Sequence, residues 1–204
     1  MTSSSVKTAH DLSAAPRTLL LRLKDETRDV PESLERDLKL VESDLTLDQY
    51  RIIVERFYGF YEPWERAIEP LLTEHLPGYA NSRAKAPRLV EDLRALKSSI
   101  ANLPLCDRLP DCANWPAVLG SLYVTEGATL GGQIVSRRLQ QKLGLSPRAG
   151  ISFFWSYGMD VSSMWRNFCA MLLAHAPPSE DDVVVRAARQ TAEAMHEWLC
   201  MKPK

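Results

Sequence analysis

The sequence predicts an all-α protein, and two patterns carry that prediction. Apolar residues recur at intervals of three and four over most of the chain, which is the period of a helix with one buried face. The apolar and polar alternation that is typical of strands does not extend beyond residues 151–155. Clusters of Pro, Gly, Asp and Asn separate the periodic segments. We therefore predict a single-domain multi-helix bundle.

The first predicted helix contains a proline. Its apolar stripe runs from Leu19 to Leu38, and Pro31 lies within it. A proline in a helix interior lacks the N–H donor and clashes one turn back, at a cost of about 3 kcal/mol or more. The stripe keeps its phase across Pro31, which favours one kinked helix. Asp29 followed by Glu32 is instead typical of a capping box that restarts a helix, so both interpretations stay open.

The later helices are predicted by their stripes and their start and stop signals. A second helix has its stripe over residues 50–64. Pro87 suits the first turn of a third helix. Asn114 begins a fourth helix, which we expect to continue to Gly144. Asp160 opens a fifth, and the pair Ser179 and Asp182 predicts a capping box for the last helix.

Composition limits the class of protein. With 204 residues, 45% of them hydrophobic, the chain can bury a core without disulfides or structural metal. Its net charge of −1 gives no electrostatic reason to expect nucleic acid or an anionic membrane as a partner. The four cysteines show no C-x-x-C pair, which favours a reduced, cytoplasmic setting. The first ten residues are polar and do not form a secretion signal, so we expect a flexible tail over 1–15 and a helical domain over 16–204.

Residues 122–133 (LYVTEGATLGGQ) are unusual for a helix because they contain Gly127, Gly131 and Gly132. Each interior glycine costs about 0.8–1 kcal/mol relative to alanine. A spacing of four puts Gly127 and Gly131 on one face and leaves a strip of bare backbone. The strip suits either a close crossing of two helices or a planar ligand held between this helix and another one.

Three separated segments show a family resemblance. They are residues 23–30 (LKDETRDV) with the Leu-Glu pair at 34–35, residues 58–65 (YGFYEPWE), and residues 120–133 (GSLYVTEGATLGGQ). In this order they resemble the proximal helix, the second helix and the distal helix of the heme oxygenases. The similarity is greatest to the bacterial type that supplies biliverdin to phytochromes. Residues 153–168 also fit this pattern.

The resemblance implies a reaction and its partners. In the family, heme is both substrate and cofactor, held between a proximal helix that supplies a histidine to iron and a glycine-rich distal helix. The reaction consumes O₂ and external electrons and releases biliverdin, carbon monoxide and iron. Because no nucleotide or flavin motif is present, a ferredoxin or flavodoxin type of donor is implied. A bacteriophytochrome is the implied receiver of the product.

The resemblance also implies residue roles. It gives catalytic roles to Gly127, Gly131 and Tyr61, and heme contacts to Lys24, Thr27, Tyr123, Gly127, Ala128, Gly131 and Gly132. Lys24 would pair with a heme propionate, although by itself it is equally a solvated surface lysine. Ala128 stands where relatives often carry aspartate or serine on a distal water network, and Tyr61 is a partial substitute in proton delivery.

The proximal histidine is the main departure from the family pattern. Its position, four residues after Thr27, is Pro31, which has no lone pair to offer to iron. The remaining candidates are the four histidines of the chain, His10, His75, His175 and His196. The first lies in the polar tail, and the next two lie at helix ends. The last follows Glu193 in a Glu-x-x-His pattern without a second copy, and we interpret it as a surface or packing residue.

Three functions therefore remain open from the sequence. The first is a heme oxygenase that makes biliverdin, with its activity in doubt because of Pro31. The second is a non-catalytic heme or tetrapyrrole carrier that has lost the iron ligand. The third is thiamine-type hydrolysis on the same fold, but Cys106 and Cys112 lie in a Pro-rich loop without the carboxylate support that a nucleophile needs.

Overall fold

The computed structural model describes residues 15–40, 42 and 44–201, so the predicted tail and His10 lie outside the described part except for residue 15. Within that part the structure is helical and contains no strand, which confirms the all-α prediction. The α-helices are α1 (Ala15–Thr27), α2 (Asp29–Leu38), α3 (Leu47–His75), α4 (Tyr79–Arg83), α5 (Ala86–Ala95), α6 (Trp115–Gly127), α7 (Thr129–Leu143), α8 (Ser152–Trp155), α9 (Val161–His175) and α10 (Asp181–Leu199). Two short 3₁₀ helices are η1 (Gly158–Asp160) and η2 (Pro178–Glu180).

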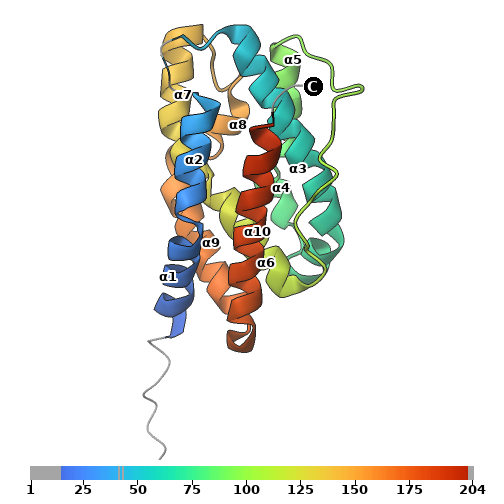
Figure 1. Cartoon of the computed structure of the whole chain (residues 1–204), viewed down its shortest axis with the longest axis vertical. Helices are drawn as coiled ribbons and strands as arrows, with labels where there is room; N and C mark the ends of the chain where they lie inside the picture. The colour runs from blue at the N-terminus through green and yellow to red at the C-terminus, as the bar shows by residue number, and fades with distance from the viewer. Residues whose placement is uncertain (1–14, 41, 43, 202–204) are drawn as a thin grey trace, which may run out of the picture.

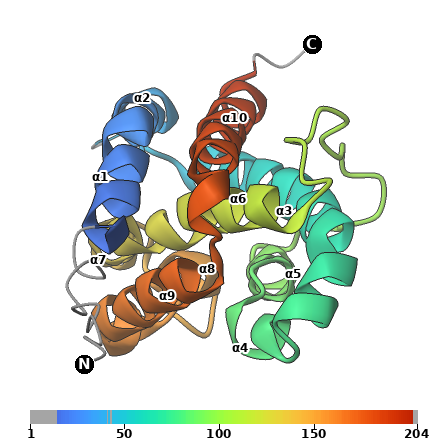
Figure 2. The same ribbon diagram turned by 90° about the horizontal axis from the view of Figure 1, so that it is seen from below.

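Helix α6 runs through the middle of the bundle, with α10, α3 and α9 around it (Figures 1 and 2). Its residues 117–122 are all buried, because neighbours cover it on every side. The contact with α10 is very close at Gly120, where a Cβ atom would lie 2.0 Å from the Val184 carbonyl oxygen. Only glycine allows this approach, so Gly120 sets the distance between the two central helices.

The first predicted helix is two helices. They follow one another along one side of the bundle and are separated at Arg28 (Figure 1). The helix restarts at Asp29, as one of the two interpretations has it, but the backbone of Arg28 stays helical (φ −58°, ψ −42°) and no side chain caps α2, so the predicted capping box is absent. Pro31 is the third residue of α2, where its missing N–H costs no helical hydrogen bond. The break before Pro31 therefore accommodates the proline and keeps the stripe in phase.

The predicted helix from Asn114 to Gly144 is also broken, although its ends are confirmed. Asn114 Oδ1 accepts from Ala117 N at 3.0 Å, and Gly144 ends α7 with φ 66°. The break falls at Ala128, between α6 and α7. The glycine-rich segment therefore sits at a junction of two helices.

The structure confirms the predicted start of α9 and contradicts the predicted start of α10. Helix α9 begins directly after Asp160, as predicted. The capping box at Ser179 is wrong, because residues 178–180 form η2 and Glu180 precedes α10 without a side-chain cap. Across the described residues, none of the helices has the length and hydropathy that crossing a membrane requires.

Candidate functional site

A cavity of about 410 Å³ lies between α1–α2 on one side and the α6–α7 junction on the other. We call it the slot. It brings together all the contact residues that the sequence predicted: Lys24, Thr27, Tyr61, Tyr123, Gly127, Ala128, Gly131 and Gly132. Two segments about a hundred residues apart in the chain thus face each other, as a ligand held between two helices requires. The structure thus places the predicted residues around one cavity.

Most of the slot wall is apolar. Helix α2 contributes Val30, Leu34 and Leu38, and aromatic side chains form the deep end. There Phe57 packs on Phe153 with ring centroids 5.0 Å apart, and Tyr61 packs edge-on against the same ring at 5.3 Å. These packed rings favour an apolar ligand body and exclude water from the deep end.

The three glycines of the α6–α7 junction have different surroundings. A Cβ atom on Gly131 would meet no heavy atom within 4 Å, and one on Gly127 would touch the Trp165 ring at 3.6 Å. A Cβ atom on Gly132 would lie 2.3 Å from the Phe154 carbonyl oxygen. Gly131 therefore leaves open space toward the slot, whereas Gly132 allows α7 to approach α8. The close crossing is therefore found at Gly132, and the open space at Gly131 is compatible with a planar ligand.

Positive charge lies at the α1 side of the slot. Lys24 and Arg28 line the cavity and are exposed to solvent, and Arg28, between α1 and α2, pairs with Asp25 of α1. An acidic group at the edge of a bound ligand would meet these cations. Exposed ion pairs of this kind orient a ligand more than they strengthen its binding.

A buried charge cluster holds the α6–α7 junction, and we call it the Glu126 cluster. Glu126 pairs with Arg83, and its Oε1 accepts from Lys85 Nζ and from the Tyr157 hydroxyl, each at 2.8 Å. Lys85 Nζ also donates to the Tyr157 hydroxyl oxygen at 2.7 Å. Burial lowers the pKa of Lys85 and raises that of Tyr157. The cluster fixes the residue before Gly127 and so positions the glycines.

Sequence reasoning missed this cluster. Glu126 is the one charged residue of the otherwise apolar helix α6, and that isolated charge was the available signal. Its partners Arg83, Lys85 and Tyr157 come from segments outside α6, and their proximity depends on packing.

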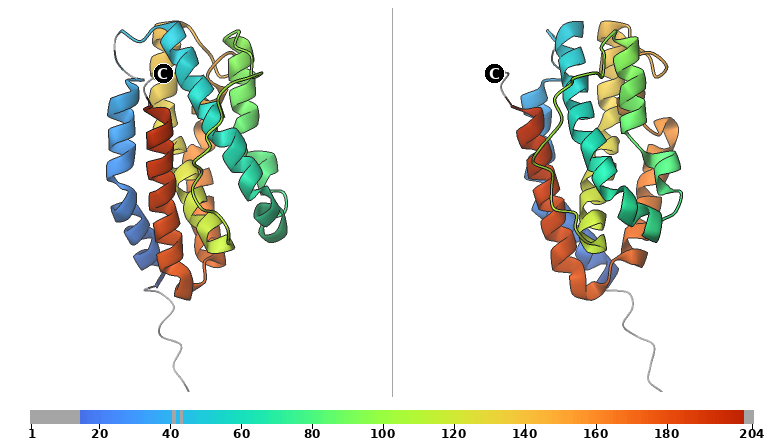
Figure 3. Two further views of the ribbon diagram at one scale, coloured as in Figure 1. Left: turned by 45° about the vertical axis from the view of Figure 1, so that its right-hand side comes forward. Right: turned by 90° about the vertical axis from the view of Figure 1, so that its right-hand side faces the viewer.

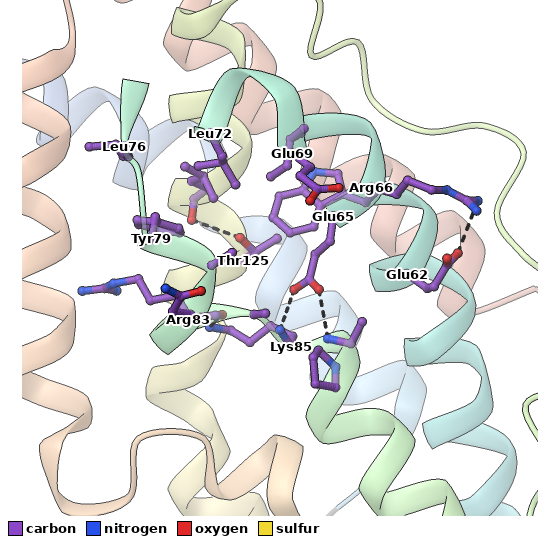
Figure 4. Close-up of a pocket in the computed structure, with 18 of the residues that line it drawn as sticks. Glu62, Glu65, Arg66, Glu69, Leu72, Leu76, Tyr79, Arg83, Lys85 and Thr125 are labelled. Atoms are coloured by element: carbon purple, nitrogen blue, oxygen red, sulfur yellow. Dashed lines mark hydrogen bonds and ion pairs between the residues drawn. The ribbon is translucent and has the colours of Figure 1, made fainter. Parts of the chain in front are cut away.

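A second cavity of about 600 Å³ lies on the other side of Lys85 and Thr125, which line both cavities (Figure 4). Glu65 of α3 turns toward the start of α5, where its carboxylate accepts from the backbone N–H groups of Lys85 and Ala86. Glu62 pairs with Arg66 at 3.4 Å. Glu62 and Glu65 are thus used in contacts within the protein. Of the two cavities, the slot has the more apolar wall.

None of the described histidines lines the slot. His75 stacks on Trp115 with ring centroids 4.5 Å apart, and His175 packs edge-on against the same ring at 6.2 Å. His196 Nε2 lies 2.8 Å from Asp37 Oδ2 outside the slot. Pro31 lies four residues after Thr27, which does line it. The described residues therefore fit the flat body and acidic edge of a porphyrin, but they offer no imidazole to a metal at its centre.

The fold and slot define an all-α protein with a largely apolar cavity between two broken helices. The sequence model of the heme oxygenase family matches residues 17–200. The chain therefore belongs to the heme oxygenase family. A heme oxygenase of Xanthomonas campestris is 27% identical over 135 residues, which are 65% of this chain and 77% of that protein.

Solved structures agree on the fold. The heme oxygenase of Neisseria meningitidis, determined with NO and CO bound, has a TM-score of 0.73 at 19% identity and covers 90% of this chain and 93% of its own. That of Leptospira interrogans has a TM-score of 0.69 at 21% identity and covers 89% and 98%. Heme oxygenase 2 of Chlamydomonas reinhardtii, solved without heme, has a TM-score of 0.68 at 19% identity and covers 91% and 97%.

Proposed function

We propose that the slot binds heme and that the protein cleaves it with O₂ and external electrons to biliverdin, carbon monoxide and iron. Family membership supports heme degradation in general. The observation that carries the proposal is the slot itself, which gathers the predicted contact residues from two segments about a hundred residues apart, together with Tyr61, around an open glycine face. When bound, heme supplies both the redox-active iron and the ring that is opened.

The slot residues have different roles in binding heme. The open face at Gly131 lets the flat ring lie against the backbone, and the aromatic deep end keeps water away from its apolar edge. Lys24 and Arg28 pair with the propionates and set the rotation of the ring in the slot. Tyr61 is the residue we assign to proton transfer in place of an acidic side chain at Ala128. Burial raises the pKa of its hydroxyl, which therefore stays protonated at neutral pH and can donate a hydrogen bond into the slot.

We further propose that the product serves a bacterial phytochrome and that a ferredoxin or flavodoxin type of protein delivers the electrons. The three resembling segments support this subtype. The chain carries no nucleotide-binding motif through which it could collect electrons itself. We assign no residue of this chain to the iron, because Pro31 stands at the expected position.

A second candidate function is a non-catalytic tetrapyrrole carrier. It is favoured by one observation, that no described histidine lines the slot. A carrier needs the flat slot and its cations but no ligand to iron.

One experiment separates the two functions. Ferric heme is added to the purified protein, binding is followed by visible absorption, and reductant and O₂ are then supplied while biliverdin is quantified by chromatography. Biliverdin formation supports the enzyme, and bound heme without product supports the carrier. Gly131→Leu fills the open face of the slot and should abolish both signals. If heme and biliverdin both fail to bind the wild-type protein, both functions are contradicted.

Replacing Pro31 tests the proposed alignment. We expect Pro31→His to convert the ferric heme spectrum to the type given by an imidazole ligand, because the residue lies one helical turn from Thr27. Pro31→Ala is the matched control, since it removes the proline without adding a nitrogen ligand. Identical spectra for the two variants would contradict the placement of Pro31 at the proximal position.

A further inference from the structure

A second group of side chains outside the slot has the composition of a metal site. Asp37 lies in the last turn of α2, His196 lies in the last turn of α10, and Cys200 follows that helix. One ligand atom from each, a carboxylate oxygen, an imidazole nitrogen and the thiol sulfur, lies within 4.8 Å of the other two. Asp37 Oδ2 and His196 Nε2 are already 2.8 Å apart.

The placement of the three residues is built into the fold. His196 and Cys200 are four residues apart, and the Cys200 N–H donates to the His196 carbonyl at 3.0 Å, so both side chains leave the same face of one turn. Helices α1–α2 and α10 run side by side (Figures 1 and 3). Arg189 of α10 holds them together by pairing with Asp29 at 2.6 Å. Arg56 of α3 donates to the Leu199 carbonyl at 2.9 Å and fixes the last turn.

The set of donor atoms selects the kind of metal. One thiolate, one imidazole and one carboxylate form a borderline set that suits Zn²⁺ and leaves a fourth position for water. With bonds of about 2.0–2.3 Å, neighbouring atoms of a tetrahedral zinc shell lie about 3.3–3.6 Å apart. The observed cluster needs only side-chain adjustments of about 1 Å to reach this shell. Asp37 and His196 have side-chain exposures of 44% and 30%, so the adjustment and the approach of a metal are not hindered by packing.

We propose that Asp37, His196 and Cys200 form a three-ligand Zn²⁺ site that links α2 to α10. The link bears on the slot because α2 forms one of its walls through Val30 and Leu34. A bound metal would hold this wall against the end of α10. Metal binding at this site requires neither bound heme nor the proposed reaction.

Metal titration of the purified, metal-free protein tests the site. We expect one equivalent of Zn²⁺ to bind, measured by competition with a chromophoric chelator. We also expect Co²⁺ to give the near-ultraviolet absorption of a thiolate ligand. Cys200→Ser should abolish that absorption and weaken Zn²⁺ binding at least tenfold, and His196→Gln should weaken it similarly. Zn²⁺ should raise the thermal midpoint of the wild-type protein and leave that of Cys200→Ser unchanged.

The control variants replace a cysteine or a histidine that lies outside the proposed metal site. Cys169→Ser and His175→Gln change a half-buried cysteine and a histidine outside the cluster, and both should bind Zn²⁺ as the wild type does. His10→Gln is included because the tail lies outside the described residues, and it should also leave binding unchanged. Circular dichroism verifies that each variant is folded. Wild-type protein that binds no zinc, or binding that survives in both Cys200→Ser and His196→Gln, would overturn the proposal.

Discussion

Gly131 and Gly132 are adjacent in the sequence and meet different surroundings. Gly131 opens toward the slot, and Gly132 is covered by the Phe154 carbonyl of α8. The sequence grouped them with Gly127 as equivalent positions, because spacing along a helix does not reveal which face another backbone approaches. Adding one methyl group at each position should therefore affect the stability of the fold differently.

We expect Gly132→Ala to destabilise the fold and Gly131→Ala not to. The methyl group of Gly132→Ala must displace backbone, and overpacking of this kind costs about 1–3 kcal/mol. The methyl group of Gly131→Ala enters open space and gains up to about 1 kcal/mol of helix propensity. Urea unfolding of both variants measures the difference. Equal free energies of unfolding would contradict the close contact between α7 and α8.

The buried carboxyl group of Asp92 makes the stability of the fold depend on pH. It is 1% exposed, and its carboxylate accepts from the backbone N–H groups of Ser152 and Phe153 at 2.6 and 2.8 Å. Burial raises its pKa to about 6, against the effect of those two hydrogen bonds. Because the folded-state pKa lies above the unfolded value of about 4, the folded state binds this proton more tightly. The stability that this proton contributes is fully present below about pH 4 and is lost as the pH rises through about 6.

The comparison with Asp92→Asn isolates this effect. The difference in unfolding free energy, wild type minus variant, should fall by about 1 kcal/mol between pH 5 and pH 7. Urea unfolding at several pH values provides the measurement. A constant difference over that interval would show that the carboxyl group titrates normally.

At the scale of elements, the Glu126 cluster joins three parts of the chain. It connects the end of α6 to Arg83 at the end of α4, to Lys85 before α5, and to Tyr157 before η1. Its side chains are almost wholly buried, with 3% exposure for Glu126 and Lys85 and 10% for Arg83. The carboxylate of Glu126 pairs with both buried cations, so removing it should have a larger effect on stability than removing one of the cations.

We expect Glu126→Gln to destabilise the protein more than Lys85→Met does. Removing the carboxylate leaves two buried cations without their partner, and breaking a buried pair in this way costs about 3–5 kcal/mol. Lys85→Met leaves Glu126 paired with Arg83 and bonded to Tyr157, and the apolar stem keeps much of its packing. Thermal unfolding of both variants tests the order. A larger loss for Lys85→Met would contradict the central role of the carboxylate.

Helix boundaries were predictable where a local signal fixes them. Asn114, Gly144 and Asp160 lie at the ends that the sequence indicated, because caps and positive-φ glycines act through neighbouring backbone. The break at Ala128 was not located, and a restart at Asp29 was one of two open interpretations, although Pro31 and the glycines marked both segments as weak helices. Where a weak helix bends depends on what packs against it.

At the scale of the whole molecule, the slot exists only when α1–α2 and α6–α7 are packed together. A ligand that binds the slot therefore binds the folded state alone and stabilises it by mass action. At a free concentration of 100 times Kd the gain is about 2.7 kcal/mol. For a chain of this size that corresponds to a rise in Tm of roughly 5–10 °C.

This rise in Tm can be measured with iron-free protoporphyrin, which tests the slot apart from iron chemistry. Differential scanning fluorimetry is disturbed by the pigment, so circular dichroism at 222 nm is the suitable readout. Gly131→Leu serves as the control with a filled slot and should show no rise. An equal rise in both proteins would place the porphyrin elsewhere.

The sequence by itself determined the helical class, several helix ends and, through the three motif segments, the residues that gather in the slot, because periodicity, caps and motifs are local properties of the chain. Only the tertiary structure decided which glycine faces the ligand and which faces a helix, and which partners surround Glu126. It also brought Asp37 to His196 and Cys200. These features join residues that are far apart in the chain, and their proximity follows from how helices pack rather than from any local pattern.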